Sequence, residues 1–316
     1  MNVVVGLGEL LWDLLPEGAR LGGAPANFTV MAARLGHRGV VASRLGAQET
    51  DMDDWGSRAR TVLSGFPVDA SLIQSDTDHP TGTVDVEFRN GEPHYVIHEP
   101  VAWDFLAWTP EWQQLAQQAD AVCFGSLAQR SQASRKTIHR FLAATRPECV
   151  RVFDVNLRAP YFSAEIVTES LERATIFKLN ESEVPQVLAM LGGTAPVSNA
   201  GTDIDETALH AAADWLLERF PLKLVAITLG GEGSLLVSRE GAHRRQGIRG
   251  PVADTVGAGD AFTAAMVDAY LRGAGLARMN EAGNRWGGWV ASQHGAMPAL
   301  SAETYTEIQN NIAEVE

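Results

Sequence analysis

The stretch DTVGAGDAFTAAMVDAYL, residues 254–271, joins a glycine-rich turn to a helix-forming run. Gly257, Ala258 and Gly259 leave the backbone almost bare where the helix is expected to begin. The first amides of a helix lack intrahelical acceptors, and the helix dipole adds partial positive charge, so such an end can bind phosphate. Asp260 would repel a resting phosphate but suits a hydroxyl that attacks one. The stretch predicts phosphoryl transfer; the alternative is an ordinary turn whose aspartate offsets the helix dipole.

Working outward, short apolar runs alternate with helical patterns over most of the 316 residues. The runs predicted as buried strands are Val3–Leu7, Ala121–Phe124, Val150–Asp154, residues 176–179 and Leu224–Thr228. Helices are predicted over residues 25–35, 135–144 and Glu206–Arg219. This alternation is typical of an α/β fold whose mostly parallel sheet is flanked by helices on both faces.

Residues 81–98 have a different pattern. Two alternating segments flank Asn90-Gly91, which is a strong signal for a β-hairpin. An antiparallel hairpin within a βα chain predicts a small separate sheet or flap.

Composition excludes several classes of protein. Acidic residues number 39 and basic residues 25, giving a net charge of −14, and the densest basic pair is Arg244-Arg245. Such a chain does not suit a nucleic-acid backbone. It has no apolar run of about 18 residues, and its first residues lack the basic start of a signal peptide, so we expect no membrane span and a cytoplasmic location. Lysine occurs only at Lys136, Lys178 and Lys223, which limits mechanisms that use a phosphate-gripping lysine.

Familiar nucleotide motifs are absent from the sequence. Gly6-Leu7-Gly8 follows a strand, but Leu11 stands where a dinucleotide fingerprint needs its third glycine. The chain also contains neither a P-loop nor the protein-kinase motifs.

Polar residues follow the predicted strands instead. Asp13 and the run GGAPAN, residues 22–27, come after the first strand. A carboxylate, bare glycine backbone and a carboxamide can together bind vicinal hydroxyls. The alternative is a glycine turn beside a solvated loop acid.

Two further groups follow later strands. Asn180 and Glu183 either orient hydrated Mg²⁺ and phosphate oxygens or form a helix cap resembling a capping box. Thr228, Gly230 and Gly233 suit nucleotide phosphates, or make a plain glycine-rich turn.

The segment DVNLR, residues 154–158, ends another predicted strand. Arg158 either meets a transferring phosphate or pairs with Asp154. Because open α/β sheets bind ligands beyond the carboxyl ends of their strands, all these groups are expected at one crevice.

Two of these stretches resemble signatures of a known family. GGAPANFTVMAARLG (residues 22–36) is similar to the N-terminal signature of ribokinase-like (PfkB-type) carbohydrate kinases, and DTVGAGDAFTAAMVDAYL to their C-terminal signature. Matching pieces run from residue 3 to residue 295. GELLWD (8–13), PTGTVDVEF (80–88) and EPVAWD (99–104) look most like bacterial fructokinases. The chain departs from the family where DVNLR replaces D-P-N-x-R, and at His294.

The resemblance implies a three-layer fold: one kinase domain over residues 1–316, with β-lid elements at approximately 12–22 and 80–103. It also implies a role for each matching residue. Asp260 would be the general base, with an anion hole at Gly257, Ala258 and Gly259. The other implied positions are Asp13, Gly23, Asn27 and Arg158 for the substrate; Asn180 and Glu183 for Mg²⁺, indirectly; Thr228, Gly230, Gly233, Asn284 and Gly295 for ATP; and Asp254 and Val256 for a monovalent cation such as K⁺.

We therefore expect an ATP- and Mg²⁺-dependent kinase that phosphorylates a primary hydroxyl of a small sugar, with fructose the leading substrate. A kinase for ribose or 2-keto-3-deoxygluconate and a non-catalytic sugar sensor of the same fold stay as alternatives. The resemblance also allows a homodimer formed through the lid.

Overall fold

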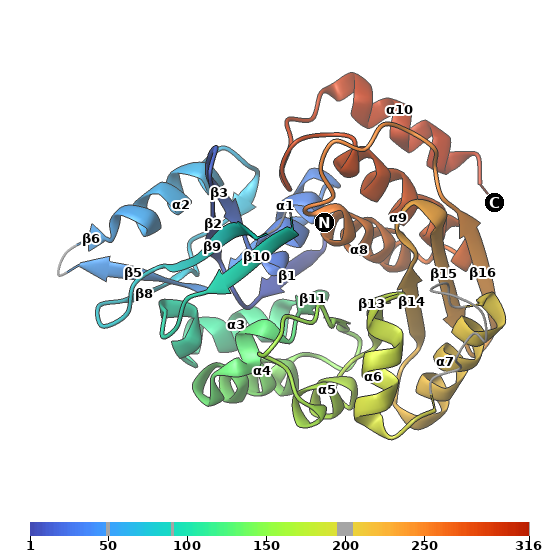
Figure 1. Cartoon of the computed structure of the whole chain (residues 1–316), viewed down its shortest axis with the longest axis horizontal. Coiled ribbons are helices and arrows are strands. Elements are labelled where there is room, and N and C mark those ends of the chain that lie inside the picture. Colours follow the sequence, from blue (N-terminus) through green and yellow to red (C-terminus); the bar gives the residue numbers. More distant parts are fainter. Residues whose placement is uncertain (49–50, 90–91, 195–204, 316) are drawn as a thin grey trace. The chain divides into compact units, whose positions relative to one another are not determined.

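The computed structural model describes residues 1–48, 51–89, 92–194 and 205–315. Contacts divide the chain into two compact units, Met1–Cys149 and Val150–Glu316, which Figure 1 colours from blue to green and from green to red. Each unit is described by itself below.

The first unit contains a parallel sheet in the order β11-β1-β4-β7. Its strands are β1 (Val3–Leu7), β4 (Arg38–Ala42), β7 (Val68–Asp69) and β11 (Ala121–Phe124), so both strands predicted here are confirmed. The helices of this unit are α1 (Ala24–Arg34), α2 (Asp54–Ser64), α3 (Pro110–Gln118) and α4 (Gln132–Ala144), with 3₁₀ turns η1 (Ala102–Phe105) and η2 (Leu127–Arg130). The helices predicted over residues 25–35 and 135–144 correspond to α1 and α4.

A separate four-stranded sheet has the order β10-β9-β2-β3. Its strands are β2 (Leu11–Leu15), β3 (Gly18–Gly22), β9 (Gly82–Arg89) and β10 (Glu92–Ile97). Strands β9 and β10 pair antiparallel, as the hairpin pattern predicted, whereas the turn at Asn90-Gly91 lies outside the described residues. Since β2 pairs with both β3 and β9, the segment after Leu10 belongs to this small sheet. A short third sheet joins β5 (Arg44–Gln48), β6 (Asp51–Met52) and β8 (Gln74–Asp76).

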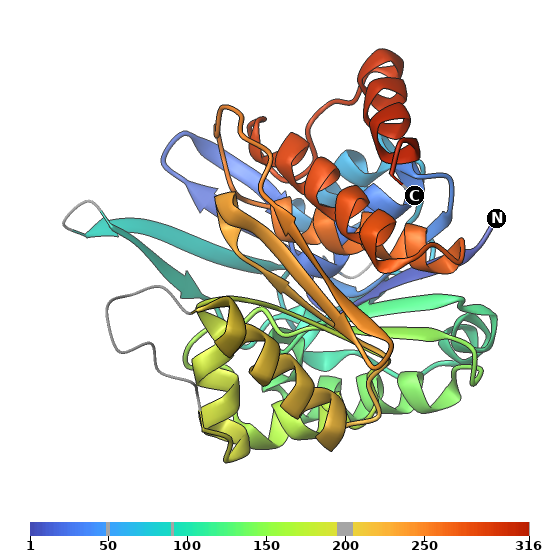
Figure 2. The same ribbon diagram turned by 90° about the vertical axis from the view of Figure 1, so that its right-hand side faces the viewer.

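The second unit contains a sheet in the order β16-β15-β14-β13-β12. Strands β12 (Val150–Asp154), β13 (Ile176–Asn180) and β14 (Leu224–Thr228) are parallel, while β15 (Gly233–Ser238) and β16 (Gly241–Gln246) add an antiparallel edge. The three parallel strands are those predicted from apolar runs. Helices α5 (Ala164–Leu171), α6 (Glu183–Leu191) and α7 (Glu206–Arg219) lie on one side of this sheet, and α8 (Ala258–Leu271), α9 (Leu276–Ala291) and α10 (Ala302–Ala313) on the other (Figures 1 and 2).

Helix α8 is the central helix of the second unit. Every residue from Ala261 to Ala269 is buried, because this run carries small and apolar side chains around the whole helix. Burial of apolar surface stabilises folding by roughly 25 cal/mol per Å², so the packed body of α8 also holds its N-terminus in place.

No helix in the described ranges has the length and apolar character needed to cross a bilayer.

Candidate active site

Helix α8 begins at the glycine turn that the sequence singled out. Gly257 is its N-cap with φ 78, a left-handed conformation that favours glycine. A Cβ at this position would lie 2.5 Å from the Cβ of Ala296, so the space also excludes a side chain. Asp260 stands in the first turn. The amide of Ala258 donates to the carbonyl of Thr255 at 3.2 Å, whereas helix geometry provides no intrahelical acceptor for the amide of Gly259.

The carboxylate of Asp254 joins two segments that are distant in sequence. Its Oδ1 accepts a hydrogen bond from the amide of Val256 at 3.0 Å, and its Oδ2 accepts one from the amide of Gly295 at 3.1 Å. Gly295 has φ 80, so it too holds a left-handed turn. The structure thus brings together Asp254 and Val256, which were expected to bind a monovalent cation, and Gly295, which was expected to bind ATP. Ala296, which packs against Gly257, was not predicted.

A buried polar chain lies behind the first turn of α8. Lys178, on β13, donates from Nζ to Oδ1 of Asp154, at the end of β12, over 3.1 Å. The hydroxyl of Thr263 is 3.2 Å from Oδ2 of Asp154 and 2.9 Å from the carbonyl of Gly259. All three residues are at most 7% exposed. Sequence reasoning missed Lys178 and Thr263; the available signal was a lysine within an otherwise apolar strand.

Asn180 and Glu183 form reciprocal hydrogen bonds at the start of α6. Oδ1 of Asn180 accepts from the amide of Glu183 at 3.0 Å, and Oε2 of Glu183 accepts from the amide of Asn180 at 2.8 Å. The other carboxylate oxygen, Oε1, accepts from the amide of Leu157 at 2.8 Å. Burial raises the pKa of Glu183, partly offset by these amides and by Lys178. The pair thus makes the reciprocal hydrogen bonds of a capping box, although the N-cap residue of α6 is Ser182, which makes no side-chain cap hydrogen bond.

The residues after β14 form a narrow glycine turn. Gly230 has φ 53 and Gly233 has φ 101, and a Cβ on Gly233 would lie 2.1 Å from the carbonyl oxygen of Arg245. Thr228 ends β14, where its hydroxyl lies 3.5 Å from the carbonyl of Leu179. Close packing against β16 thus excludes a side chain at Gly233, whereas a Cβ on Gly230 would meet nothing within 4 Å.

Asn284 belongs to a polar network between α9 and β15. Its Nδ2 lies 2.7 Å from Oγ of Ser234 and 2.9 Å from Oδ1 of Asn280. Ser234 and Asn280 are both fully buried and also hydrogen-bond each other. The network fixes the orientation of the Asn284 carboxamide, and its two buried members were not predicted from the sequence.

Arg158 is exposed and donates to the carbonyl of Leu157 at 3.1 Å. Asn156, two residues earlier, has φ 39, which few residues other than glycine adopt. The carboxylate of Asp154, a candidate partner of Arg158 in the sequence, pairs with Lys178.

The predicted sugar residues lie in the first unit. Asp13 is on β2 and not in a loop. A Cβ built on Gly22 would lie 2.6 Å from Oδ2 of Asp13. Gly23 is the N-cap of α1 with φ 110, and a Cβ there would lie 2.5 Å from the carbonyl oxygen of Glu9. Asn27 lies in the first turn of that helix and is 6% exposed. The start of α1 and the small sheet thus place a carboxylate, a carboxamide and bare backbone within one unit.

These residues differ in how well they suit nucleotide and metal. The start of α8 offers helix-terminal amides and a glycine cap, which fit a phosphate oxygen. Asn180 and Glu183 use their oxygens for backbone amides, so they fit Mg²⁺ through intervening water and not as direct ligands. The donor set therefore fits a metal that is held mainly by nucleotide phosphates.

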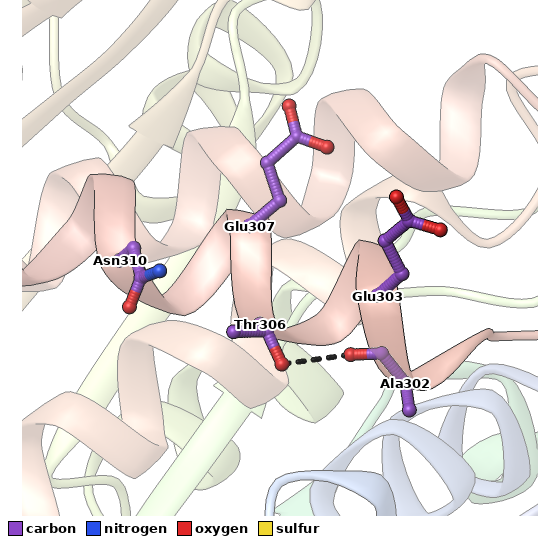
Figure 3. A pocket seen from close by; sticks show the side chains of 5 residues that line it. All are labelled: Ala302, Glu303, Thr306, Glu307 and Asn310. Atoms are coloured by element: carbon purple, nitrogen blue, oxygen red, sulfur yellow. Dashed lines mark hydrogen bonds between the residues drawn. The ribbon is translucent and has the colours of Figure 1, made fainter.

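A pocket on α10 is lined by none of the predicted residues. Its lining is Ala302, Glu303, Thr306, Glu307 and Asn310 (Figure 3). The two glutamates carry negative charge, which would oppose a nucleotide phosphate.

Comparison with known proteins identifies the family. The model of the pfkB family carbohydrate kinases matches residues 18–303. A structure of an uncharacterized sugar kinase, PH1459, from Pyrococcus horikoshii in complex with ATP is 26% identical, with a TM-score of 0.78, and the match covers 98% of this chain and 100% of that one. Aminoimidazole riboside kinase of Salmonella typhimurium is 28% identical, covering 95% of this chain and 92% of the relative.

A fructokinase from Vibrio cholerae, solved with fructose, ADP and calcium ion bound, is 26% identical, with a TM-score of 0.77 and coverage of 97% of this chain and 98% of that one. A double mutant of that enzyme, 25% identical with a TM-score of 0.75 and coverage of 97% and 98%, is in a fructose-, ADP- and potassium-bound form. The fold is thus the ribokinase-like α/β fold, a large mostly parallel sheet with helices and a small separate sheet. The chain belongs to the pfkB family of carbohydrate kinases and is an ATP-dependent sugar kinase.

Proposed function

We propose that this sugar kinase transfers the γ-phosphoryl group of ATP to a primary hydroxyl of fructose. The observation that carries the chemistry is the start of α8, where a left-handed glycine cap at Gly257 and the carboxylate of Asp260 share one helix terminus. A helix N-terminus favours anions, and a carboxylate beside a phosphate bound there is well placed to act on the hydroxyl that attacks the phosphate.

Asp260 is the proposed general base. It accepts the proton of the sugar hydroxyl as the oxygen bonds to the γ-phosphorus, while the bond from that phosphorus to the β–γ bridging oxygen breaks and ADP leaves. The anion hole is proposed at Gly257, Ala258 and Gly259, where helix-terminal amides stabilise charge that develops on the transferring group. Arg158 is proposed to meet the same charge. Most of the rate enhancement comes from positioning and charge stabilisation, since phosphoryl transfer needs little covalent chemistry from the protein.

Asp13, Gly23 and Asn27 are proposed to bind the sugar. A carboxylate and a carboxamide accept and donate hydrogen bonds to neighbouring hydroxyls, and Gly23 permits close approach because a Cβ there meets the carbonyl of Glu9. The small sheet that carries Asp13 is proposed to act as the lid, which limits access of water to the reacting phosphate.

The phosphates of ATP are proposed to lie against Thr228, Gly230 and Gly233. The adenine is proposed to lie against Asn284 and the Gly295 turn. Bound Mg²⁺ would neutralise phosphate charge, with Asn180 and Glu183 acting on it through water. A monovalent cation such as K⁺ is proposed near Asp254 and Val256; support comes from the potassium-bound form of the Vibrio cholerae relative.

Fructose is favoured because GELLWD and EPVAWD resemble fructokinase segments and because the Vibrio cholerae relative binds fructose. A riboside is the second candidate, since the Salmonella relative is named for aminoimidazole riboside.

The test is ATP consumption with fructose, ribose, 2-keto-3-deoxygluconate and aminoimidazole riboside at equal concentrations, with a mock preparation from cells that lack the protein as the control for contaminating kinases. We expect the highest kcat/KM with fructose. Preference for another compound would overturn the fructose assignment, and sugar binding without ATP turnover would instead indicate a sensor.

A further inference from the structure

Lys178 is a buried cation that the proposed function leaves without a role. It is one of three lysines in the chain and is 7% exposed. Burying an ammonium is costly unless it is paired and hydrogen-bonded. Burial by itself lowers the pKa of Lys178, but the charges of Asp154, Glu183 and Asp260 outweigh it and raise that pKa, so the side chain is charged at neutral pH.

The ammonium lies against the backbone of the proposed anion hole. A Cβ built on Gly259 would lie 3.1 Å from Nζ of Lys178, so glycine at this position leaves the space that the ammonium occupies. Asp154 binds Nζ at 3.1 Å and lies 3.2 Å from the hydroxyl of Thr263, one turn further along α8. The Lys178–Asp154 pair therefore lies against two successive turns at the start of α8.

A purely structural ion pair is the competing explanation. A buried pair is weak evidence for stability, because apolar residues of similar volume often serve as well or better. The location of the pair argues for function. Three carboxylates raise the pKa of Lys178, and one of them is the proposed general base, Asp260. Because charges inside a protein are poorly screened, the ammonium acts on any negative charge formed at this helix terminus.

We propose that Lys178 is a positioning residue for phosphoryl transfer, whose fixed positive charge beneath Gly259 stabilises the negative charge that develops at the start of α8. The inference rests on the proposed function of this helix terminus. Lys178 acts through the backbone of Gly259 and is not a phosphate ligand.

The test compares Asp154→Asn with the double variant Lys178→Met/Asp154→Asn. The first keeps the lysine charge but removes its counter-ion, and the second leaves a neutral buried pair. Lys178→Met alone would leave Asp154 buried without its partner and is liable to misfold, which is why the double variant is used. Lys223→Met, at an exposed lysine, is the matched control.

We expect the two variants to rank in one order by melting temperature and in the reverse order by kcat. The double variant should melt at a higher temperature than Asp154→Asn, because its buried pair is uncharged. Its kcat should nevertheless be lower than that of Asp154→Asn and about tenfold below wild type; this loss is smaller than the 10²–10³-fold typical of losing a direct donor. KM for sugar and for ATP should stay near wild type, since the charge acts on the transition state.

A kcat that follows the melting temperature, with the double variant the more active of the two, would overturn the inference. Asp260→Asn measured in parallel separates this from a failure of the proposed function. If Asp260→Asn keeps its turnover, the proposed chemistry at α8 is wrong; if it loses turnover while kcat follows stability, only the role of Lys178 is wrong.

Discussion

Replacing Gly257 with alanine tests whether the start of α8 is as tightly constrained as its geometry indicates. Two costs combine at this residue. Its φ of 78 is left-handed, which costs a residue with a Cβ about 1–2 kcal/mol. The new Cβ would also lie 2.5 Å from the Cβ of Ala296, whereas carbon atoms prefer about 3.5 Å or more, so one segment must move by about 1 Å. Overpacking of this kind costs about 1–3 kcal/mol.

Gly192 provides a matched control. It is the C-cap of α6 with φ 74, and a Cβ there would meet nothing within 4 Å. Gly192→Ala should therefore lose only the backbone part, about 1–2 kcal/mol, while Gly257→Ala should lose about 2–5 kcal/mol in total. In a domain of 150–250 residues each kcal/mol lowers Tm by about 2–4 °C, so thermal melts can separate the two variants.

Activity should separate the variants more clearly than stability does. Displacing the first turn of α8 by about 1 Å should lower kcat by roughly 10²-fold, because positioning controls phosphoryl transfer. Gly192→Ala should keep kcat near wild type, since Gly192 caps the end of α6 opposite Glu183 and a Cβ there meets nothing within 4 Å. Coupled ATP assays on the folded proteins give both values. If kcat of Gly257→Ala is close to that of Gly192→Ala, the contact with Ala296 does not position the reacting groups and the reasoning is refuted.

Three other changes test separate parts of the proposal. Asp260→Asn should fold and bind sugar but lose turnover by orders of magnitude, measured as steady-state kcat; retention of most activity would contradict the base assignment. Asp13→Ala should raise KM for the sugar much more than KM for ATP, and an equal rise in both would count against a sugar contact. Burial raises the pKa of Glu281, but Arg245 and Arg285 outweigh it and lower that pKa. Its stabilising effect is thus present above the ordinary carboxyl pKa, about 4.3, and is lost as the pH falls through the lowered value. The Tm difference between wild type and Glu281→Gln should be largest near neutral pH and vanish in acid; a difference that persists in acid would show that shape and not charge stabilises this site.

Strands and helices with strong periodic patterns were predictable. The apolar runs at Val3–Leu7, Ala121–Phe124 and Leu224–Thr228 are strands with the predicted bounds, because a buried strand needs apolar side chains on both faces. Strand β2 was less visible. Aspartate is a residue type typical of loops, yet Asp13 lies in a strand because β3 and β9 pair with that segment from both sides.

The candidate site was predictable in part for the same reason. Glycines with left-handed φ, such as Gly257 and Gly233, stand out in a sequence, since other residues pay for that conformation. The buried residues that pack against these glycines could not be predicted in the same way, because a lysine in a strand does not reveal which carboxylate neutralises it. The partner of Lys178 is Asp154, 24 residues earlier in the chain.

By itself, the sequence determined the alternation of strands and helices, the glycine turn before α8 and the presence of Asp260 at that helix terminus, because backbone conformation and hydrophobic periodicity are local properties. Tertiary structure decided which distant groups meet that turn. Ala296 excludes a side chain at Gly257, Asp254 ties Val256 to the Gly295 turn, and Lys178 brings a buried positive charge beneath Gly259. These contacts join residues far apart in the chain, and packing and charge compensation within the folded unit select them.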